Sequence, residues 1–380
     1  MPGVEIERGL SRVADLKISA DTFWQLEVCN ACRYCEGYCA VFPALERRRR
    51  FTPGDVVYLA NLCHDCRACF YACMYAPPHE FGVNIPKALA EVRERTYAAY
   101  ALPRVVSDLA QRTAWLLVGA TLLSAVFFVA VAAGGDFFGV HTGPGAFYAV
   151  VPYLAMMLPA LAVSVYAIGV LGAGAFAFAR DTRGNAADFV HWPALREAGR
   201  DALGLHYLRG GQAGGCYYPS ARTSNARLIL HMLVFYGFLS ALAATIAAFI
   251  LQDVFGQLPP YPILSVPVVL GSLGGVAMIV GATGLLYLKW RSDRAPGDER
   301  TLKLDWLFLL SLDVVSITGM ALLIVRDTPL MGFTLVVHLA TVLALFVAAP
   351  YGKFAHFVYR YAALVQNRLE SRLTTPHNAT

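Results

Sequence analysis

The stretch CNACRYCEGYC at residues 29–39 decides the fold of the N-terminal part, because its pattern returns as CHDCRACFYAC at residues 63–73. In each run three cysteines stand three positions apart and a fourth follows four positions later. A proline, Pro43 or Pro77, comes four positions after that. Eight of the nine cysteines lie between Cys29 and Cys73. Such density and regularity are typical of metal ligands and not of scattered disulfide bonds.

The repeat predicts two [4Fe–4S] clusters. Three cysteines at this spacing can wrap one side of a cubane within one tight loop, and the fourth thiolate must then come from elsewhere. In two-cluster ferredoxins the fourth cysteine of each run ligates the other cluster. We therefore expect one cluster on Cys29, Cys32, Cys35 and Cys73, and a second cluster on Cys63, Cys66, Cys69 and Cys39.

Zinc is the alternative metal for this domain, although zinc usually takes cysteines as two separated pairs and not as triplets. Ala40 and Met74 stand where the runs of bacterial ferredoxins have proline. This departure favours the more helical cluster domains of respiratory dehydrogenase subunits. His64 and His79 flank the second run and are expected to be polar neighbours of the cluster, since the cysteines already supply eight thiolates.

The basic run at residues 47–50 lies between the two cysteine runs. It predicts a solvated surface, with docking of an acidic partner or of anionic lipid head groups as the alternative.

The rest of the chain is too apolar for an ordinary soluble protein. Of all residues 57% are hydrophobic and 15% are charged, and six apolar stretches are each long enough to cross a bilayer as a helix. Several glycines in the fourth stretch predict close helix packing and not a dinucleotide-binding loop, because they lie within an apolar helix. The six stretches lie near residues 113–133, 147–178, 228–251, 263–288, 304–325 and 331–352.

The charges of the loops predict the orientation of these stretches. The loop after the second stretch and the loop after the fourth are rich in arginine and lysine, whereas residues 134–146 and 252–261 contain neither. Because basic loops stay in the cytoplasm, we expect a multi-pass protein of the cytoplasmic (inner) membrane with both termini cytoplasmic. Glu5, Glu7 and Arg8 interrupt any apolar core, so no cleavable secretory signal is expected. The net charge of +5 belongs mostly to these loops, so no nucleic acid partner is expected.

Three histidines within or beside the apolar stretches predict haem b, because a histidine inside the membrane needs a partner. A haem with two axial imidazoles takes one histidine from each of two facing helices. His231 and His356 both lie toward the cytoplasmic side and form the preferred pair. His338 precedes His356 by eighteen residues, or five turns of one helix unless Pro350 bends it. Its partner stays open, with His141 as the candidate, so one or two haems are expected.

Together these patterns predict a mainly α protein, with an N-terminal helical ferredoxin-like domain holding two cubane clusters and then a six-helix transmembrane bundle. The predicted units are a cytoplasmic cluster domain at residues 1–105, a membrane haem b domain at 106–360 and a cytoplasmic tail at 361–380. Residues 86–97 have the spacing of a short amphipathic helix. Cys216, outside the repeat, is expected to be a structural thiol, with a sensor or ligand role as the alternative.

The last apolar stretch resembles the last haem-binding helix of the gamma subunit of respiratory nitrate reductase. In that family two histidines at this spacing each ligate a haem, and the partner helix carries two histidines ten residues apart. Here Ala241 stands ten positions after His231. The resemblance therefore implies the inner pair of His231 and His356 and leaves the outer haem without its second ligand. The matching residues are His338, Phe346, Pro350, Lys353 and His356.

Nearly the whole chain resembles the tricarballylate-utilisation protein B family, also called the citrate-utilisation protein B family. The resemblance implies an electron-transfer protein that reoxidises the reduced flavin of a separate FAD-dependent tricarballylate dehydrogenase flavoprotein and passes the electrons into the membrane, to quinone. The segments that carry it are residues 27–39, 61–73, 76–81, 235–238 and 350–354.

No phosphate-binding glycine loop, catalytic triad or flavin fingerprint occurs in the sequence, so substrate conversion is expected in another subunit. Whether this chain counts as an enzyme stays open. One alternative is the reverse flow from quinol to a cytoplasmic reductase, as in membrane subunits associated with heterodisulfide reductase. Another is a membrane protein whose cysteine domain senses iron or redox state, which predicts clusters without haem.

Overall fold

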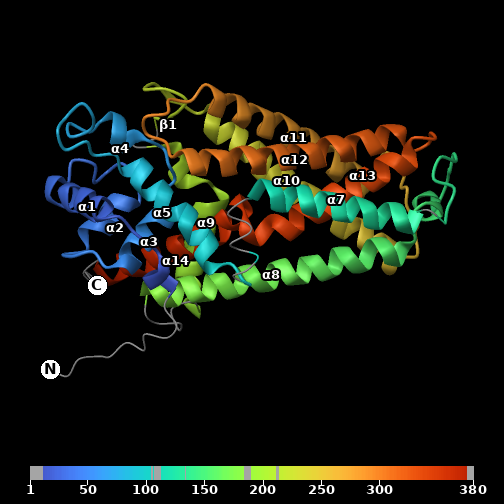
Figure 1. Ribbon diagram of the computed structural model, residues 1–380, viewed down its shortest axis with the longest axis horizontal. Helices are drawn as coiled ribbons and strands as arrows, with labels where there is room; N and C mark the ends of the chain where they lie inside the picture. The colour runs from blue at the N-terminus through green and yellow to red at the C-terminus, as the bar shows by residue number, and fades with distance from the viewer. Residues whose placement is uncertain are drawn as a thin grey trace, which may run out of the picture.

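The computed structural model describes residues 12–103, 106, 113–132, 134–183, 190–210 and 214–374. Figure 1 shows short helices gathered at one end of the molecule and a bundle of long helices that runs away from them. Some parts named in the sequence analysis lie outside the described residues. These are residues 1–11, the stretch around the predicted boundary after residue 105 except residue 106, and residues 375–380 of the predicted tail. The chain is mainly helical, as predicted.

The N-terminal domain is built from short helices, several of which begin or end close to a cysteine. Thr52 and Asp55 form a capping box at the start of α3, which ends beside Cys63. Helix α1 ends at Cys32, where Arg33 takes the left-handed conformation and turns the chain. The predicted amphipathic helix is confirmed as α5. The elements are η1 (Arg12–Asp15), α1 (Ala20–Cys32), α2 (Val41–Glu46), α3 (Pro53–Leu62), α4 (Ala68–Tyr71) and α5 (Ile85–Tyr100).

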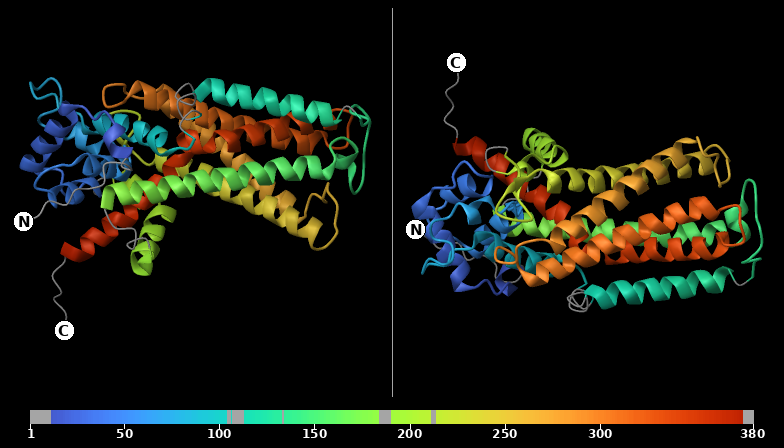
Figure 2. Two further views of the ribbon diagram at one scale, coloured as in Figure 1. Left: turned by 60° about the horizontal axis from the view of Figure 1, so that its bottom comes forward. Right: turned by 90° about the horizontal axis from the view of Figure 1, so that it is seen from above.

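Six of the described helices are long and apolar enough to cross a membrane, which confirms the six predicted stretches. They keep many large apolar side chains on the outside, as lipid-facing helices do. Figure 2 shows α7 at one side of the bundle, where it packs against α13. The helices are α7 (Thr113–Ala132), α8 (Tyr153–Arg183), α10 (Ala226–Asp253), α11 (Val266–Trp290), α12 (Glu299–Val325) and α13 (Met331–Ala348).

Helices α10 and α11 approach each other through their glycines. A Cβ atom added at Gly274 would come within 2.6 Å of Gly237 O, and one added at Gly281 would come within 2.7 Å of Leu230 O. Both glycines therefore allow the two backbones to touch, as small residues do in membrane helix pairs. The glycines of the fourth stretch serve packing, as predicted.

The chain breaks between His338 and His356, which corrects the expectation of one continuous helix. Helix α13 ends at Ala348, and two short 3₁₀ turns, η6 (Ala349–Tyr351) and η7 (Lys353–Ala355), precede α14 (His356–Thr374). Pro350 cannot donate a backbone hydrogen bond, and Gly352 is extended, so the helix cannot continue through them.

The predicted tail is largely a packed helix. Helix α14 continues through residue 361 and packs against α3, α8 and α9 (Trp192–Leu203), and thereby joins the N-terminal domain to the membrane bundle. Arg368 forms a two-pronged bond with Asp201 of α9 at 2.7 Å.

Most of the remaining described elements lie in the loop between α8 and α10. Strands β1 (Cys216–Tyr217) and β2 (Thr223–Ser224) pair antiparallel, with Cys216 opposite Ser224. The Cys216 thiol is buried and donates to Leu208 O at 2.9 Å, which fits the expected structural thiol, and its role stays a prediction. Two short 3₁₀ turns complete the described elements, η2 (Ala146–Ala149) and η4 (His206–Arg209).

Candidate cluster and haem sites

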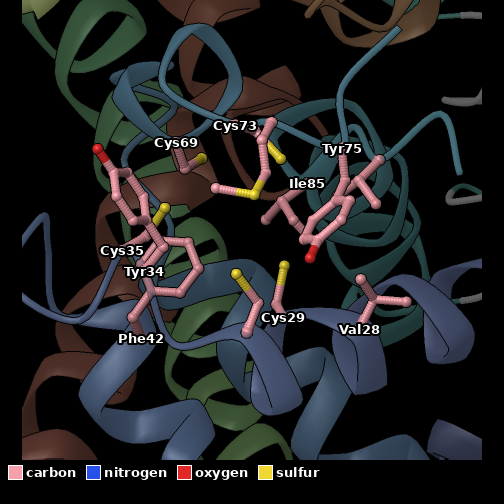
Figure 3. Close-up of a pocket in the computed structure, with 12 residues that line it drawn as sticks. Val28, Cys29, Tyr34, Cys35, Phe42, Cys69, Cys73, Tyr75 and Ile85 are labelled. Atoms are coloured by element: carbon pink, nitrogen blue, oxygen red, sulfur yellow. The ribbon is translucent and has the colours of Figure 1, made fainter. Parts of the chain in front are cut away.

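The first candidate site is a hollow of about 470 Å³ between α1, the loop after α4 and the start of α5. Figure 3 shows the sulfur atoms of Cys29, Cys35 and Cys73 turned toward one common space. Cys32 and Cys69 line the same hollow. The remaining wall is apolar and aromatic and comes from Val28, Tyr34, Phe42, Met74, Tyr75, Val83 and Ile85.

The second candidate site is an adjacent hollow of about 320 Å³, lined by Cys39, Cys63, Cys66 and Cys69. Cys69 lines both hollows, so the two sites share a wall. The structure therefore brings together the two sets of four cysteines that the crossing of the fourth cysteines predicts. The ligation of iron by these thiols stays a prediction.

Most thiols in the two hollows are crowded and partly or fully shielded from solvent, whereas Cys32 is exposed. Burial, helped by the neighbouring Cys73, raises the pKa of Cys29 and Cys35 to about 12. Burial also raises the pKa of Cys66 to about 12. Such thiols become thiolates only beside a cationic centre, which bound iron supplies.

The thiols of the repeat are spread around the two hollows. Within the described residues, no three Cys, His, Asp or Glu side chains converge closely enough to hold one metal ion. The sulfurs instead surround hollows, as the corners of a cubane require. The choice between iron–sulfur clusters and the zinc alternative stays a prediction.

Arginines from three helices bond the backbone of the second cysteine loop, residues 63–66. Arg360 of α14 donates to Cys63 O at 2.8 Å, and Arg93 of α5 donates to the same oxygen at 2.9 Å. Arg227 of α10 donates to Asp65 O and to His64 O, the latter at 3.2 Å. Two of these arginines begin or follow membrane helices, so the bundle holds this loop directly.

Two more contacts join the second loop to the loops of the membrane half. The Tyr217 backbone N–H of β1 donates to Cys66 O at 3.0 Å. The Arg67 side chain donates to Ser292 Oγ at 2.8 Å and to Asp293 O at 3.1 Å. Arg67 itself has a left-handed backbone, with φ at 63°.

The structure brings His231 and His356 together, with ring centres 6.3 Å apart and ring planes at 81° to each other. Two imidazoles bound to one metal from opposite sides, with metal–nitrogen bonds of about 2 Å, have ring centres about 6 Å apart. His356 Nδ1 lies 2.7 Å from Lys353 O, an arrangement that leaves Nε2 free to ligate. His231 Nδ1 is buried without a hydrogen-bond partner among the described residues. The pair fits the axial ligands of haem b, although ligation itself stays a prediction.

Aromatic side chains surround this pair. The Phe308 ring lies 6.4 Å from the His356 ring, and Phe354 contacts both Phe308 and Phe238. An apolar wall of this kind suits a porphyrin face.

Each of the two histidines has an arginine four residues away on its own helix. Arg227 precedes His231 on α10, and Arg360 follows His356 on α14. Residues four apart lie on one face of a helix, so Arg227 and Arg360 each lie one turn from the histidine of their own helix. The same two arginines bond the second cysteine loop. The second hollow and the histidine pair are therefore neighbouring sites that are held by the same two helices, α10 and α14.

His338 has different surroundings from the histidine pair. Its Nδ1 lies 3.1 Å from Thr318 Oγ1, and a Cβ added at Gly319 would come within 2.9 Å of its ring. The outer candidate, His141, has its Nε2 2.8 Å from Asp136 O, within its own loop. Their expected role with a second haem stays a prediction.

Other residues singled out in the sequence have structural partners. His64 is a neighbour of the second hollow, as expected, and burial lowers its pKa. His79 is exposed and accepts from Phe81 N at 3.1 Å. The basic run is only partly solvated, because Arg48 bonds Asp55 and Glu370.

Sequence reasoning missed a buried charged group beside the histidine pair. Lys289 of α11 and Lys353 of η7 both bond the carboxylate of Asp305 on α12, the latter at 2.7 Å. Burial lowers the pKa of Lys353 to about 8. The sequence could have pointed to this group, because charged residues stand at the ends of the apolar stretches and such residues commonly mark functional sites.

These features define a class, a helical protein with six potential membrane spans and a cysteine-rich domain at one end. Residues 107–377 match the family model of citrate utilization protein B, and residues 23–99 match the model of its Fer4-like domain. The chain is 43% identical over 349 residues to citrate utilization protein B of Escherichia coli, a match that covers 91% of each chain. The protein belongs to the citrate utilization protein B family. No solved structure matches it.

The comparisons confirm the family resemblance and indicate an iron–sulfur domain at the N-terminal end. The six apolar helices are compatible with a multi-pass membrane protein. The number of clusters, the haem, the quinone and the side of the membrane on which the termini lie stay predictions.

Proposed function

We propose that this protein takes electrons from a partner FAD-dependent dehydrogenase of the tricarballylate type and delivers them to the quinone pool of the membrane. In this proposal two [4Fe–4S] clusters are held by the eight cysteines of the repeat, and haem b is held by His231 and His356. When bound, these groups accept and release electrons one at a time, and so couple a two-electron flavin to the membrane.

The order of the candidate sites carries the proposal. Cys32 at the first hollow is exposed, so an external donor can approach this site. The second hollow shares Cys69 with the first. Arg227 and Arg360 then join the loop of the second hollow to the two helices that carry the histidine pair. The sites form one series that leads from the surface to the membrane helices.

The residues of this chain contribute rigidity to that series. Electron transfer slows steeply with distance, so a conduit needs fixed separations between its centres. The arginine bonds hold the second cysteine loop to α10 and α14, and Arg67 holds it to the loop after α11. Movement of the cluster domain relative to the bundle would break all of these bonds.

The family supports the choice of donor. The Escherichia coli relative is named for citrate utilization, which supports a donor that oxidises a tricarboxylic acid. The apolar surface of the six helices supports a lipid-soluble acceptor.

Anaerobic purification of the full-length protein in detergent tests the cofactors. We expect about eight cluster iron atoms and about eight sulfides per chain, together with haem b absorption after reduction by dithionite. Zinc in place of iron would reject the cluster assignment. Clusters without haem would favour the sensor alternative.

Histidine variants test the axial pair in the same preparation. His231→Ala and His356→Ala are expected to lose most of the haem and to keep the iron–sulfur absorption. His206→Ala is the matched control, because His206 is exposed on the η4 turn. His338→Ala removes haem only if a second haem is present. Full haem retention in the first two variants would reject the pair.

A further inference from the structure

Positive charge accumulates between the second cysteine loop and the histidine pair. Arg67 and Asp65 offset each other at 3.7 Å. The remaining charged groups that form bonds in this region are five cations and one carboxylate, namely Arg93, Arg227, Lys289, Lys353, Arg360 and Asp305, and the carboxylate of Glu94 lies within electrostatic range of Lys353. Burying such an excess is costly unless anions occupy the same region.

The second cluster accounts for part of this excess. Arg93 and Arg360 both bond Cys63 O, and Arg227 bonds the two following carbonyls, so these three cations face the cysteine loop. Four thiolates around a cubane carry net negative charge and offset them. Lys289 and Lys353 lie apart from that loop and share Asp305 as their bonded acceptor.

The two lysines have more hydrogen-bonding capacity than Asp305 uses. Each ammonium has three N–H donors, and Asp305 supplies one oxygen to each. Their side chains are 16% and 18% exposed, so bulk water does not surround them. Tyr218 Oη and Arg360 Nε, in the same region, are buried without partners among the described residues. Lys289 lies 6.0 Å from the Tyr218 ring.

Lys353 also connects this group to the histidine pair. Its carbonyl oxygen lies 2.7 Å from His356 Nδ1, and Asp305 lies one turn before Phe308, whose ring contacts His356. An anion held by the lysines would therefore belong to the molecule that His356 ligates. Haem b carries two carboxylates on flexible arms, and Lys and Arg bind such groups by charge-assisted hydrogen bonds.

We propose that Lys289 and Lys353 form the site that binds the carboxylate groups of the haem, with Asp305 holding the two ammoniums in place. The inference rests on the proposed function in one respect, the presence of haem b at His231 and His356. The lysines determine how firmly the haem is retained and raise its reduction potential, because positive charge stabilises the more negative reduced form.

Haem transfer from the purified protein to apomyoglobin tests the site without any assay of activity. Lys289→Gln and Lys353→Gln are expected to transfer haem about tenfold faster, since each removes a hydrogen bond between charged groups. Lys353→Arg is expected to stay near the unmodified rate. Lys303→Gln is the matched control, because Lys303 is exposed on the same helix as Asp305.

The haem midpoint potential separates a binding role from a purely structural one. Loss of either lysine lowers the potential, whereas Asp305→Asn raises it because it removes a negative charge. If the three side chains only stabilised the fold, all three variants would release haem faster and shift the potential in one direction, which would overturn the inference. Unchanged transfer rates in the lysine variants, with haem present, would also overturn it. Absence of haem from the unmodified protein would overturn the proposed function as well.

Discussion

The two cysteine runs have the same spacing but lie in different surroundings. In the first run Cys32 is exposed, whereas Cys63 and Cys66 of the second run are buried. Backbone groups of the first loop bond mostly within that loop, as in the bond from Tyr38 N to Cys35 O. Carbonyls of the second loop accept instead from arginines of α5, α10 and α14 and from β1.

This difference shows how one cysteine pattern can lie in two different surroundings within one domain. The spacing of the cysteines is the same in both runs, whereas the surrounding elements decide which hollow has an exposed cysteine and which is enclosed by the apolar helices and their loops. Figure 1 shows the same division at the scale of the molecule, with α1 at the far end of the N-terminal domain and α14 at the junction.

The largest expected effect concerns the crossing of ligands between the runs. Cys29→Ser should remove one cluster and roughly half of the cluster iron. Adding Cys73→Ser should remove little more, because both residues line the first hollow. Adding Cys39→Ser should instead remove nearly all cluster iron, because Cys39 lines the second hollow. Iron and sulfide analysis of anaerobic preparations measures each step.

The informative result is the one from Cys29→Ser combined with Cys73→Ser. If both cysteines bind the same cluster, the first substitution already removes that cluster, so the second has little iron left to remove. Equal iron loss in the two double variants would show that the fourth cysteines do not cross. Cys216→Ser is the control, because its thiol bonds Leu208 O and lies outside both hollows.

The grouping of the cysteines and the six long helices were predictable from the sequence because each depends on a local pattern. Three cysteines within seven residues lie close together in any fold, although the structure places Cys29 and Cys32 on α1 and not in a loop. An apolar stretch of about twenty residues forms a helix in lipid. Pro350 was equally visible. Whether it bends or ends the helix depends on the packing of Tyr351 and on the extended Gly352, which a local pattern does not report.

The arginines around the second cysteine loop were not predictable in this way. Arg93 lies on the buried face of α5, although its neighbours have the spacing of an ordinary amphipathic helix. Arg360 lies in the segment adjoining the predicted tail, and its contact with Cys63 joins residues 297 positions apart. Tertiary packing alone brings such residues together. The pairing of His231 and His356 could be predicted from the sequence only because few histidines lie within or beside the apolar stretches, which leaves few possible partners.

A smaller effect should appear in the cluster potentials. Arg360→Gln removes a buried positive charge beside the second cysteine loop. At an effective dielectric constant near 20, a charge about 7 Å away contributes roughly 2 kcal/mol, or a shift of about 50–100 mV for one electron. The potential of one cluster should fall, since its reduced form loses stabilisation. Redox titration followed by electron paramagnetic resonance resolves the two clusters.

The comparison of the runs supplies the controls for this shift. Arg33→Gln removes an exposed charge beside the first run and should change either potential far less, because solvent screens it. Arg360→Lys keeps the charge and should restore most of the potential. An equal shift of both clusters in Arg360→Gln would contradict the assignment of this arginine to the second site alone.

The smallest expected effect concerns the contact of α14 with the segment that lies between the two cysteine runs. Arg48, which follows α2, forms a two-pronged bond with Glu370 at 2.7 and 3.1 Å. Glu370→Gln should cost about 1 kcal/mol, because the pair is partly screened by solvent, and should lower the temperature of cluster loss by a few degrees. Glu197→Gln, at the more exposed pair with Arg372, should cost less than about 0.5 kcal/mol. Because Arg48 lies between the runs, both clusters should be lost at the same lowered temperature. Loss of the first cluster alone would show that α14 supports only one side of the domain.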